Sequence, residues 1–247
     1  MPELSGFNLV DPAVITKRMV VRVSGRDGVG KTRFALTAPG PIAYFDMDRG
    51  AEGVVEQFAG EKDIHVASYY DRPIITESDM EARWEVFNLD WATAIADPGI
   101  RTIVWDTDNA AWEWMRMAMY FKADQIPPNK YGPLNRGFKA IIDMIYDTDK
   151  NMVFITHDKK CYVDRVSARG TISSWNGEWE TGGFNTLPNI VQCNLRLAWT
   201  AERAYHGTIG KCRQNGMLRG QEIEGEEIDF VSLALMVYPN SRETDWV

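Results

Sequence analysis

Residues 19–32 read MVVRVSGRDGVGKT, and this stretch decides the fold class. Its first six residues are mostly apolar and β-branched, which is typical of a buried strand. The eight residues from Gly25 to Thr32 then match the pattern G-x-x-x-x-G-K-[ST], and residues 31–38 follow as a short helix that Pro39 ends. A strand, a glycine-rich loop and a helix in this order predict an α/β protein that binds nucleotide phosphates.

The residue types of this loop suit a nucleoside triphosphate and a magnesium ion. Glycines let backbone N–H groups curl around the phosphates, Lys31 is expected to reach the β- and γ-phosphates, and the Thr32 hydroxyl is expected to bind Mg²⁺. ATP and Mg²⁺ are therefore the predicted cofactors. The predicted nucleotide-binding residues are Gly25, Arg26, Asp27, Gly28, Val29, Gly30, Lys31 and Thr32.

Strands and helices alternate through the first 156 residues, which predicts a mostly parallel sheet with helices on both faces. After that, residues 190–200 and 204–212 predict an antiparallel extension, and residues 221–229 an acidic surface loop. We expect one domain over residues 19–247, preceded by an N-terminal extension, residues 1–18. The other predicted strands are 42–46, 64–69, 101–106 and 152–156, and the other predicted helices 51–59, 76–96, 109–123 and 134–146.

Carboxylates at two strand ends are the candidates for metal binding and for catalysis. Asp106 closes the strand at 101–106, where the residue that holds Mg²⁺ belongs; Asp108 is the alternative, and a helix cap is the non-catalytic interpretation. Asp46 and Asp48 compete for the role of orienting the attacking water. Strand alternation predicts that Asp46 and Asp48 lie on one side of the chain.

Composition excludes several classes of protein. A net charge of −8 argues against a surface that coats nucleic acid as a whole, but leaves a local basic groove open. Without an apolar run of about 20 residues or a signal peptide, a cytoplasmic protein with no membrane partner is expected. Neither a disulfide nor a zinc site is predicted, because the cysteines and histidines are few and isolated: Cys161, Cys193, Cys212, His65, His157 and His206.

Taken in order over roughly residues 20–216, these motifs resemble the RecA superfamily, most of all the small RecA-like ATPases of bacteriophages associated with single-strand annealing and recombination. The resemblance favours Asp48 as the catalytic base, at a position where RecA itself has Glu. It also implies that His157, after the strand at 152–156, senses the γ-phosphate; an ordinary histidine at a strand end is the alternative.

The same resemblance places DNA-binding loops in two segments predicted to be irregular, residues 125–131 and 159–184. Cations that meet phosphates and rings that stack on bases suit single-stranded DNA. Glu178 and Glu180 oppose this electrostatically, and a surface hairpin with packed tryptophans is the alternative. The predicted DNA-binding residues are Lys130, Tyr131, Lys159, Lys160, Arg165, Arg169, Trp175 and Trp179.

Lys211 and Arg213 resemble the basic strand that reaches a neighbouring subunit's nucleotide in RecA filaments; plain solvated charges are the alternative. The resemblance thus implies an ATP-hydrolysing recombination or annealing protein, a homo-oligomer with nucleotide at its interfaces, and a single-strand DNA-binding protein as a further partner. A phage origin would place it in the host cytoplasm. The competing hypotheses are an ATPase of this fold that drives or switches a protein partner, and a nucleotide or small-molecule kinase.

Overall fold

The computed structural model describes residues 18–70, 74–121, 126–167, 170–200, 204–225 and 228–246, with only the backbone described for 165–167 and 170–172. Within these residues, a nine-stranded sheet has the order β3-β2-β4-β5-β1-β7-β8-β9, and β6 pairs with β5 outside this row. The strands are β1 (Val20–Gly25), β2 (Ile42–Asp46), β3 (Ile64–Ser68), β4 (Thr102–Asp106), β5 (Asn151–Ser167), β6 (Gly170–Thr181), β7 (Cys193–Trp199), β8 (Tyr205–Cys212) and β9 (Glu222–Glu224).

The strands from β3 to β7 in this spatial order run parallel to one another. In contrast, β8 is antiparallel to β7, and β9 is antiparallel to β8. The sequence prediction of a mostly parallel α/β sheet with an antiparallel C-terminal extension is therefore confirmed. The helices are α1 (Lys31–Leu36), α2 (Glu77–Ala96), α3 (Asp108–Tyr120), α4 (Tyr131–Asp143), α5 (Leu187–Ile190) and α6 (Phe230–Val237).

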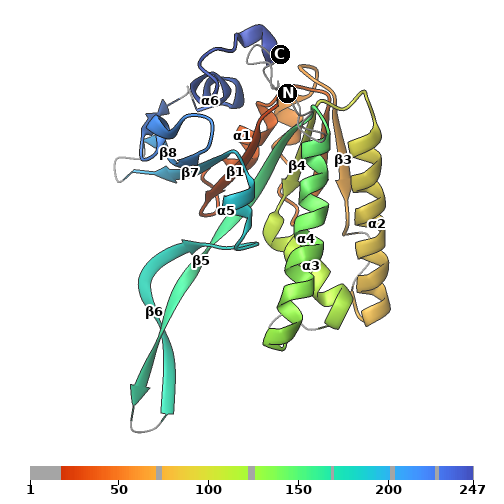
Figure 1. Cartoon of the computed structure of the whole chain (residues 1–247), viewed down its shortest axis with the longest axis vertical. Coiled ribbons are helices and arrows are strands. Elements are labelled where there is room, and N and C mark those ends of the chain that lie inside the picture. Colours follow the sequence, from red (N-terminus) through yellow and green to blue (C-terminus); the bar gives the residue numbers. More distant parts are fainter. Residues whose placement is uncertain are drawn as a thin grey trace, which may run out of the picture.

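Helices cover both faces of the sheet, as predicted (Figure 1). Successive residues of a strand point to opposite faces, so Phe45 of β2 packs with α2, α3 and α4, whereas Tyr44 packs with α1 and α6. The long helix α2 begins where the sequence predicted, because Thr76 and Asp79 form a capping box in which each side chain accepts from the other's backbone N–H. These two apolar layers fix the strand ends that carry the polar site.

The prediction of an irregular segment at residues 159–184 is wrong, and the alternative of a surface hairpin describes most of it. Strand β5 continues beyond the core as far as Ser167 and pairs with β6 from Asp158↔Thr181 to Ser167↔Gly170. The two strands form a ribbon that projects from the body of the protein (Figure 1), and we call it the β5–β6 ribbon. Because neither face of the ribbon is covered by a core, its sequence lacks the apolar–polar alternation that identifies a half-buried strand.

Three shorter predictions also need correction. Residues 51–59 contain only a 3₁₀ turn at Val55–Phe58. In the segment predicted to be irregular at residues 125–131, Pro128–Lys130 forms a 3₁₀ turn and α4 begins at Tyr131, because a proline in the first helical turn loses no hydrogen bond. The predicted acidic loop contains strand β9, whose backbone pairs with β8. Helices α5 and α6 were not predicted.

The parallel register brings several predicted site residues to one edge of the sheet. Gly25 lies beside His157, and Asp46 lies beside Asp106 in the pairing of β2 with β4. Ligands of open α/β sheets bind at this edge, outside the carboxyl ends of the strands. The fold therefore presents the glycine-rich loop, the acidic strand ends and His157 together.

Candidate functional site

The glycine-rich loop connects β1 to α1 and lines a cavity of 450 Å³, a volume within the range of small-ligand sites. Lys31 is buried, and its ammonium group donates to the carbonyl oxygens of Gly25 (3.2 Å) and Arg26 (2.8 Å). Burial lowers the pKa of Lys31. Lining residues of this cavity are Asp27, Gly28, Gly30, Lys31, Thr32, Arg33, Asp48, Gly50, Val54, Gln57, Asp106 and His157.

The first residue of the loop packs so closely against β7 that only glycine fits there. A Cβ atom added to Gly25 would lie 2.4 Å from the carbonyl oxygen of Leu197, far inside van der Waals contact. The start of the loop is therefore fixed against the neighbouring strand. This rigid start positions the N–H groups that follow it.

Asp106 is the strand-end carboxylate that faces Thr32. Its Oδ2 accepts hydrogen bonds from the Thr32 hydroxyl (2.9 Å) and from the hydroxyl of Tyr44. Burial, together with the nearby charge of Asp48, raises the pKa of Asp106 to about 6. A carboxylate and a hydroxyl are oxygen ligands of the kind Mg²⁺ prefers, so the residues present fit the predicted metal.

Asp48 and His157 complete the polar end of the cavity. The Nε2 atom of His157 lies 2.9 Å from Asp48 Oδ2, and Nδ1 lies 2.7 Å from Asp27 Oδ1. The hydrogen bond to Asp48 raises the pKa of His157, because two carboxylates favour the imidazolium form. Ligand atoms of Asp48, Asp106 and His157 lie within 4.8 Å of one another, so this group could hold a divalent cation.

This geometry distinguishes the competing carboxylates that the sequence left open: Asp46 from Asp48, and Asp106 from Asp108. The prediction that Asp46 and Asp48 share one side of the chain is wrong. Asp46, the last residue of β2, accepts from Gly50 N (2.9 Å) and Tyr70 Oη (3.2 Å) and does not line the cavity, whereas Asp48 does. Asp108 is fully buried, and its carboxylate accepts from Thr156 Oγ and from Phe184 N. Of the competing residues, Asp48 and Asp106 line the cavity.

Some residues that hold the site were missed by sequence reasoning. Asn109 brackets His157, since its Oδ1 accepts from the His157 backbone N–H (2.8 Å) and its Nδ2 donates to the His157 carbonyl (3.4 Å). Gly183 has φ +73°, and a Cβ added there would lie 2.2 Å from Asp108 Oδ2. Neither belongs to a recognisable motif; only the three-dimensional proximity of α3 to the end of the β5–β6 ribbon reveals them.

Comparison with known protein families agrees with this geometry. The model of a family described as AAA domain (AAA_24) matches residues 17–218, which include the glycine-rich loop, Asp106 and the ribbon. The chain belongs to the AAA domain family. This places it among the P-loop ATPases of AAA type, which bind nucleotides. A search of curated proteins gives no match.

In this AAA domain, the β5–β6 ribbon has two different faces. Opposite residues of an antiparallel pair share a face, and Lys160 is opposite Trp179 while Tyr162 is opposite Trp175. The Lys160 ammonium lies 5.3 Å from the centre of the Trp175 ring, and the rings of Trp175 and Trp179 lie 6.2 Å apart. We call Lys160, Tyr162, Trp175 and Trp179 the aromatic face of the ribbon.

The other face of the ribbon is electrostatically neutralised at its root. Lys159 is opposite Glu180, and their charged groups lie 3.2 Å apart. Arg165 lies in β5, where only its backbone is described, and Arg169 lies outside the described residues. Lys130 is exposed at the end of a 3₁₀ turn, while Tyr131 starts α4 and packs partly against the core, so these two lie on an element separate from the ribbon.

The AAA domain holds Lys211 and Arg213 against its own backbone. The Lys211 ammonium donates to the carbonyls of Pro188 (2.9 Å) and Asn189 (3.1 Å), and Arg213 also contacts the Asn189 carbonyl. The two side chains therefore point to one side, towards the end of α5, and they are absent from the lining of the nucleotide cavity. Any contact with a neighbouring subunit's nucleotide would replace these bonds.

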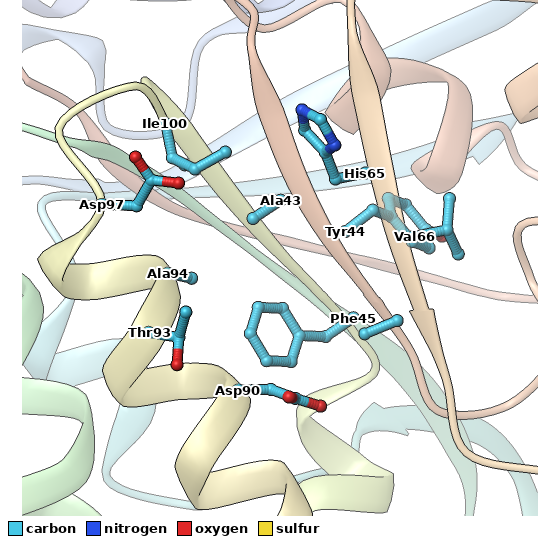
Figure 2. Close-up of a pocket in the computed structure, with 11 residues that line it drawn as sticks. Ala43, Tyr44, Phe45, His65, Val66, Asp90, Thr93, Ala94, Asp97 and Ile100 are labelled. Atoms are coloured by element: carbon cyan, nitrogen blue, oxygen red, sulfur yellow. The ribbon is translucent and has the colours of Figure 1, made fainter.

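A further cavity of the AAA domain, of 240 Å³, lies between α2 and the β2–β3 edge (Figure 2). Asp90 accepts from the Tyr69 hydroxyl (2.9 Å), and Asp97 accepts from Gly99 N (2.8 Å). Both carboxylates of the lining therefore serve local structure, and we assign no chemistry to this cavity. In the described part of the chain, no helix has the length and apolarity to cross a bilayer.

Proposed function

We propose that this AAA domain hydrolyses ATP with Mg²⁺ and acts on single-stranded DNA in recombination or annealing. One observation carries the proposal. Strand β5 runs from the core of the sheet to His157, which lines the nucleotide cavity, and then continues as one strand of the ribbon that bears the aromatic face. A DNA-contacting element and a phosphate-contacting residue thus share one strand. On this proposal, the protein would work like the RecA-like recombination ATPases of bacteriophages, which its sequence motifs resemble.

The nucleotide half of the proposal assigns one task to each side chain. Loop N–H groups and Lys31 bind the phosphates, and Thr32 with Asp106 holds Mg²⁺, which would neutralise phosphate charge when bound. Asp48 orients the attacking water, since its carboxylate lines the same cavity. His157, 2.9 Å from Asp48, contacts the γ-phosphate and keeps Asp48 in place.

The DNA half rests on the ribbon and on the cavity at its root. In the aromatic face, Tyr162 is 58% and Trp175 is 46% exposed, so their rings are open to stacking with bases. A cavity of 510 Å³ next to the ribbon's root has Arg22 and Arg196 in its lining, and Arg196 is paired with Asp158 (2.7 Å). A DNA phosphate in this cavity would take the place of Asp158 beside Arg196.

Two contacts couple the halves. The guanidinium of Arg26, in the phosphate loop, lies 4.5 Å from the centre of the Trp179 ring, a cation–π distance. Gly182, at the end of the ribbon, donates its N–H to the His157 carbonyl (3.0 Å). A γ-phosphate that draws His157 away from Asp27 would therefore shift the ribbon, and DNA on the ribbon would shift the loop.

The proposal also includes a homo-oligomer with nucleotide at its subunit interfaces. We assign Lys211 and Arg213 to the neighbour's nucleotide, and their absence from the lining of their own nucleotide cavity supports this. A single-strand DNA-binding protein would be a further partner, because a recombination protein meets DNA already covered by it.

The test is steady-state ATP hydrolysis with and without single-stranded DNA, with Lys31→Ala as the blank. We expect stimulation by DNA that weakens as salt rises, because phosphate contacts release counterions. Hydrolysis that is indifferent to DNA, with no DNA binding in the presence of an ATP analogue, would favour an ATPase that acts on a protein partner. Transfer of the γ-phosphate to a nucleotide or small molecule, and not to water, would favour a kinase.

A further inference from the structure

Two of the cysteines face each other across the antiparallel pair of β7 and β8. The register pairs Cys193 with Cys212, and the next pair along, Gln192 and Arg213, is joined by a backbone hydrogen bond of 2.9 Å. Cys193 and Cys212 therefore form a non-hydrogen-bonded pair, in which Cα atoms lie about 4.5 Å apart and side chains are closest. This spacing falls within the Cα range of disulfides, about 4.4–6.8 Å.

The two thiols are in contact and chemically unequal. Cys193 is fully buried and Cys212 is 7% exposed, and both belong to the apolar layer beneath α6. A hydrogen bond from Cys193 to the Cys212 sulfur lowers the pKa of Cys212, as does the Asn215 backbone N–H, 3.3 Å from this sulfur. The same thiol–thiol bond, followed by burial, raises the pKa of Cys193. Both are free thiols in this structure.

We infer that Cys193 and Cys212 are a dithiol that a small organic disulfide oxidises to an intramolecular disulfide. The Cys212 thiolate attacks one sulfur of oxidised glutathione, which breaks that S–S bond and releases one glutathione thiol as a mixed disulfide forms. Cys193 then loses its proton, attacks the Cys212 sulfur and displaces the second glutathione. Two protein thiols are oxidised, and one glutathione disulfide is reduced to two thiols.

The disulfide would lie next to the two cations at the end of β8. Cys212 lies between Lys211 and Arg213. The side chains of these two cations lie on the opposite face of the sheet from Cys212 and bind backbone carbonyls of α5. A Cys193–Cys212 bond would fix the end of β8 against β7, and with it the base of these two cations. The inference needs neither ATP hydrolysis nor DNA binding to be correct, because it depends only on the strand register.

The wild-type protein provides the test, which avoids variants that fold poorly. The native protein is incubated with oxidised glutathione at pH 8, then denatured and alkylated with N-ethylmaleimide, and its intact mass and tryptic peptides are measured. We expect one alkylated cysteine, Cys161, in place of three, and a linked pair of peptides that contain Cys193 and Cys212. Because Arg196, Arg203 and Lys211 separate the two cysteines, trypsin leaves them joined only by the disulfide.

A matched control is Cys161→Ser, which should form the same linked peptides at the same rate. Three alkylated cysteines after oxidation, or bonds that join Cys161 or two chains instead, would overturn the inference. As a second readout, Cys212→Ser should lose the linked pair, and its buried Cys193 should stay unreacted in the native state. Glutathione found on Cys193 at the wild-type rate in that variant would show that Cys212 is not the attacking thiol.

Discussion

At the scale of single residues, Asp106 shows a conflict between stability and function. Its carboxylate is 2% exposed, and its pKa is raised to about 6. A carboxyl group whose pKa is higher in the folded than in the unfolded protein destabilises the fold at pH values above the folded pKa. This cost vanishes below the unfolded pKa, where both states are protonated. Without a cation, the residue that would hold Mg²⁺ is therefore a source of instability.

We expect Asp106→Asn to unfold at a higher temperature than the wild type when both proteins are free of nucleotide. A shift from 3.8 to about 6 corresponds to at most about 3 kcal/mol at pH 8. The difference should shrink as the pH falls from 6 to 4. Thermal unfolding in EDTA at several pH values measures it, and a difference that is constant over this range would contradict the assigned pKa. Adding Mg-ATP should stabilise the wild type more than the variant, which keeps the phosphate loop but loses the carboxylate for Mg²⁺.

Asp48 is the residue whose removal separates binding from turnover. Asp48→Asn should still bind ATP, because the loop and Asp106 are intact, but should lower turnover roughly 10²- to 10⁴-fold, the range of general-base contributions. Lys31→Ala, in contrast, should lose tight binding. Equilibrium binding of a fluorescent ATP analogue, together with phosphate release, distinguishes the two. Normal turnover in Asp48→Asn would show that another group orients the water.

At the scale of secondary-structure elements, the aromatic face of the β5–β6 ribbon should be needed for DNA binding. Lys160→Gln combined with Trp175→Ala should weaken single-stranded DNA binding and remove DNA stimulation, because one cation and one stacking ring are lost. ATP hydrolysis without DNA should change little. Fluorescence anisotropy at two salt concentrations measures the affinity.

The matched control for this prediction is Lys139→Gln. Lys139 is an exposed lysine of α4 that pairs with Asp143, so the change removes one charge outside the ribbon. It should leave DNA affinity nearly unchanged. If Lys139→Gln weakens binding as much as the ribbon variant, the effect comes from overall charge and the aromatic face is not the DNA site.

How far the sequence could predict the structure also differs from element to element. Buried strands such as β1 and β4 can be predicted from the sequence, because burial requires apolar runs. The start of helix α2 can also be predicted, because Thr76 and Asp79 form a capping box. The ribbon could be predicted only as an alternative, a surface hairpin with packed tryptophans, since a strand pair exposed on both faces has no core to impose a pattern. Asn109 and Gly183 support the site through contacts with residues far away in the sequence, and a local sequence pattern cannot predict such contacts.

At the scale of the whole molecule, the proposed oligomer makes a prediction about mixtures. Lys31→Ala lacks its own nucleotide, and a Lys211→Gln, Arg213→Gln variant lacks the cations proposed to act on a neighbour. Each should be inactive alone. Mixed in equal amounts, about one quarter of head-to-tail interfaces would combine an intact site with intact cations, so activity should reappear. Phosphate release from the mixture, with each variant's unfolding temperature as a check of folding, measures it.

No recovery in the mixture, from variants that both fold and assemble, would show that Lys211 and Arg213 act within their own subunit. Their bonds to the carbonyls of Pro188 and Asn189 would then be their whole role. Recovery would instead mean that these bonds break when a neighbour binds.

Strand β5 crosses from the core into the ribbon without a break, and this continuity has a mechanical meaning. From His157 to Ser167 the strand advances by ten residues, or about 33 Å at 3.3 Å per residue. A rotation of about 5° at His157 would therefore carry the tip through about 3 Å, close to the rise of one residue. If the ribbon binds DNA as proposed, a small rotation at His157 would thus move the DNA-binding tip by about the length of one residue.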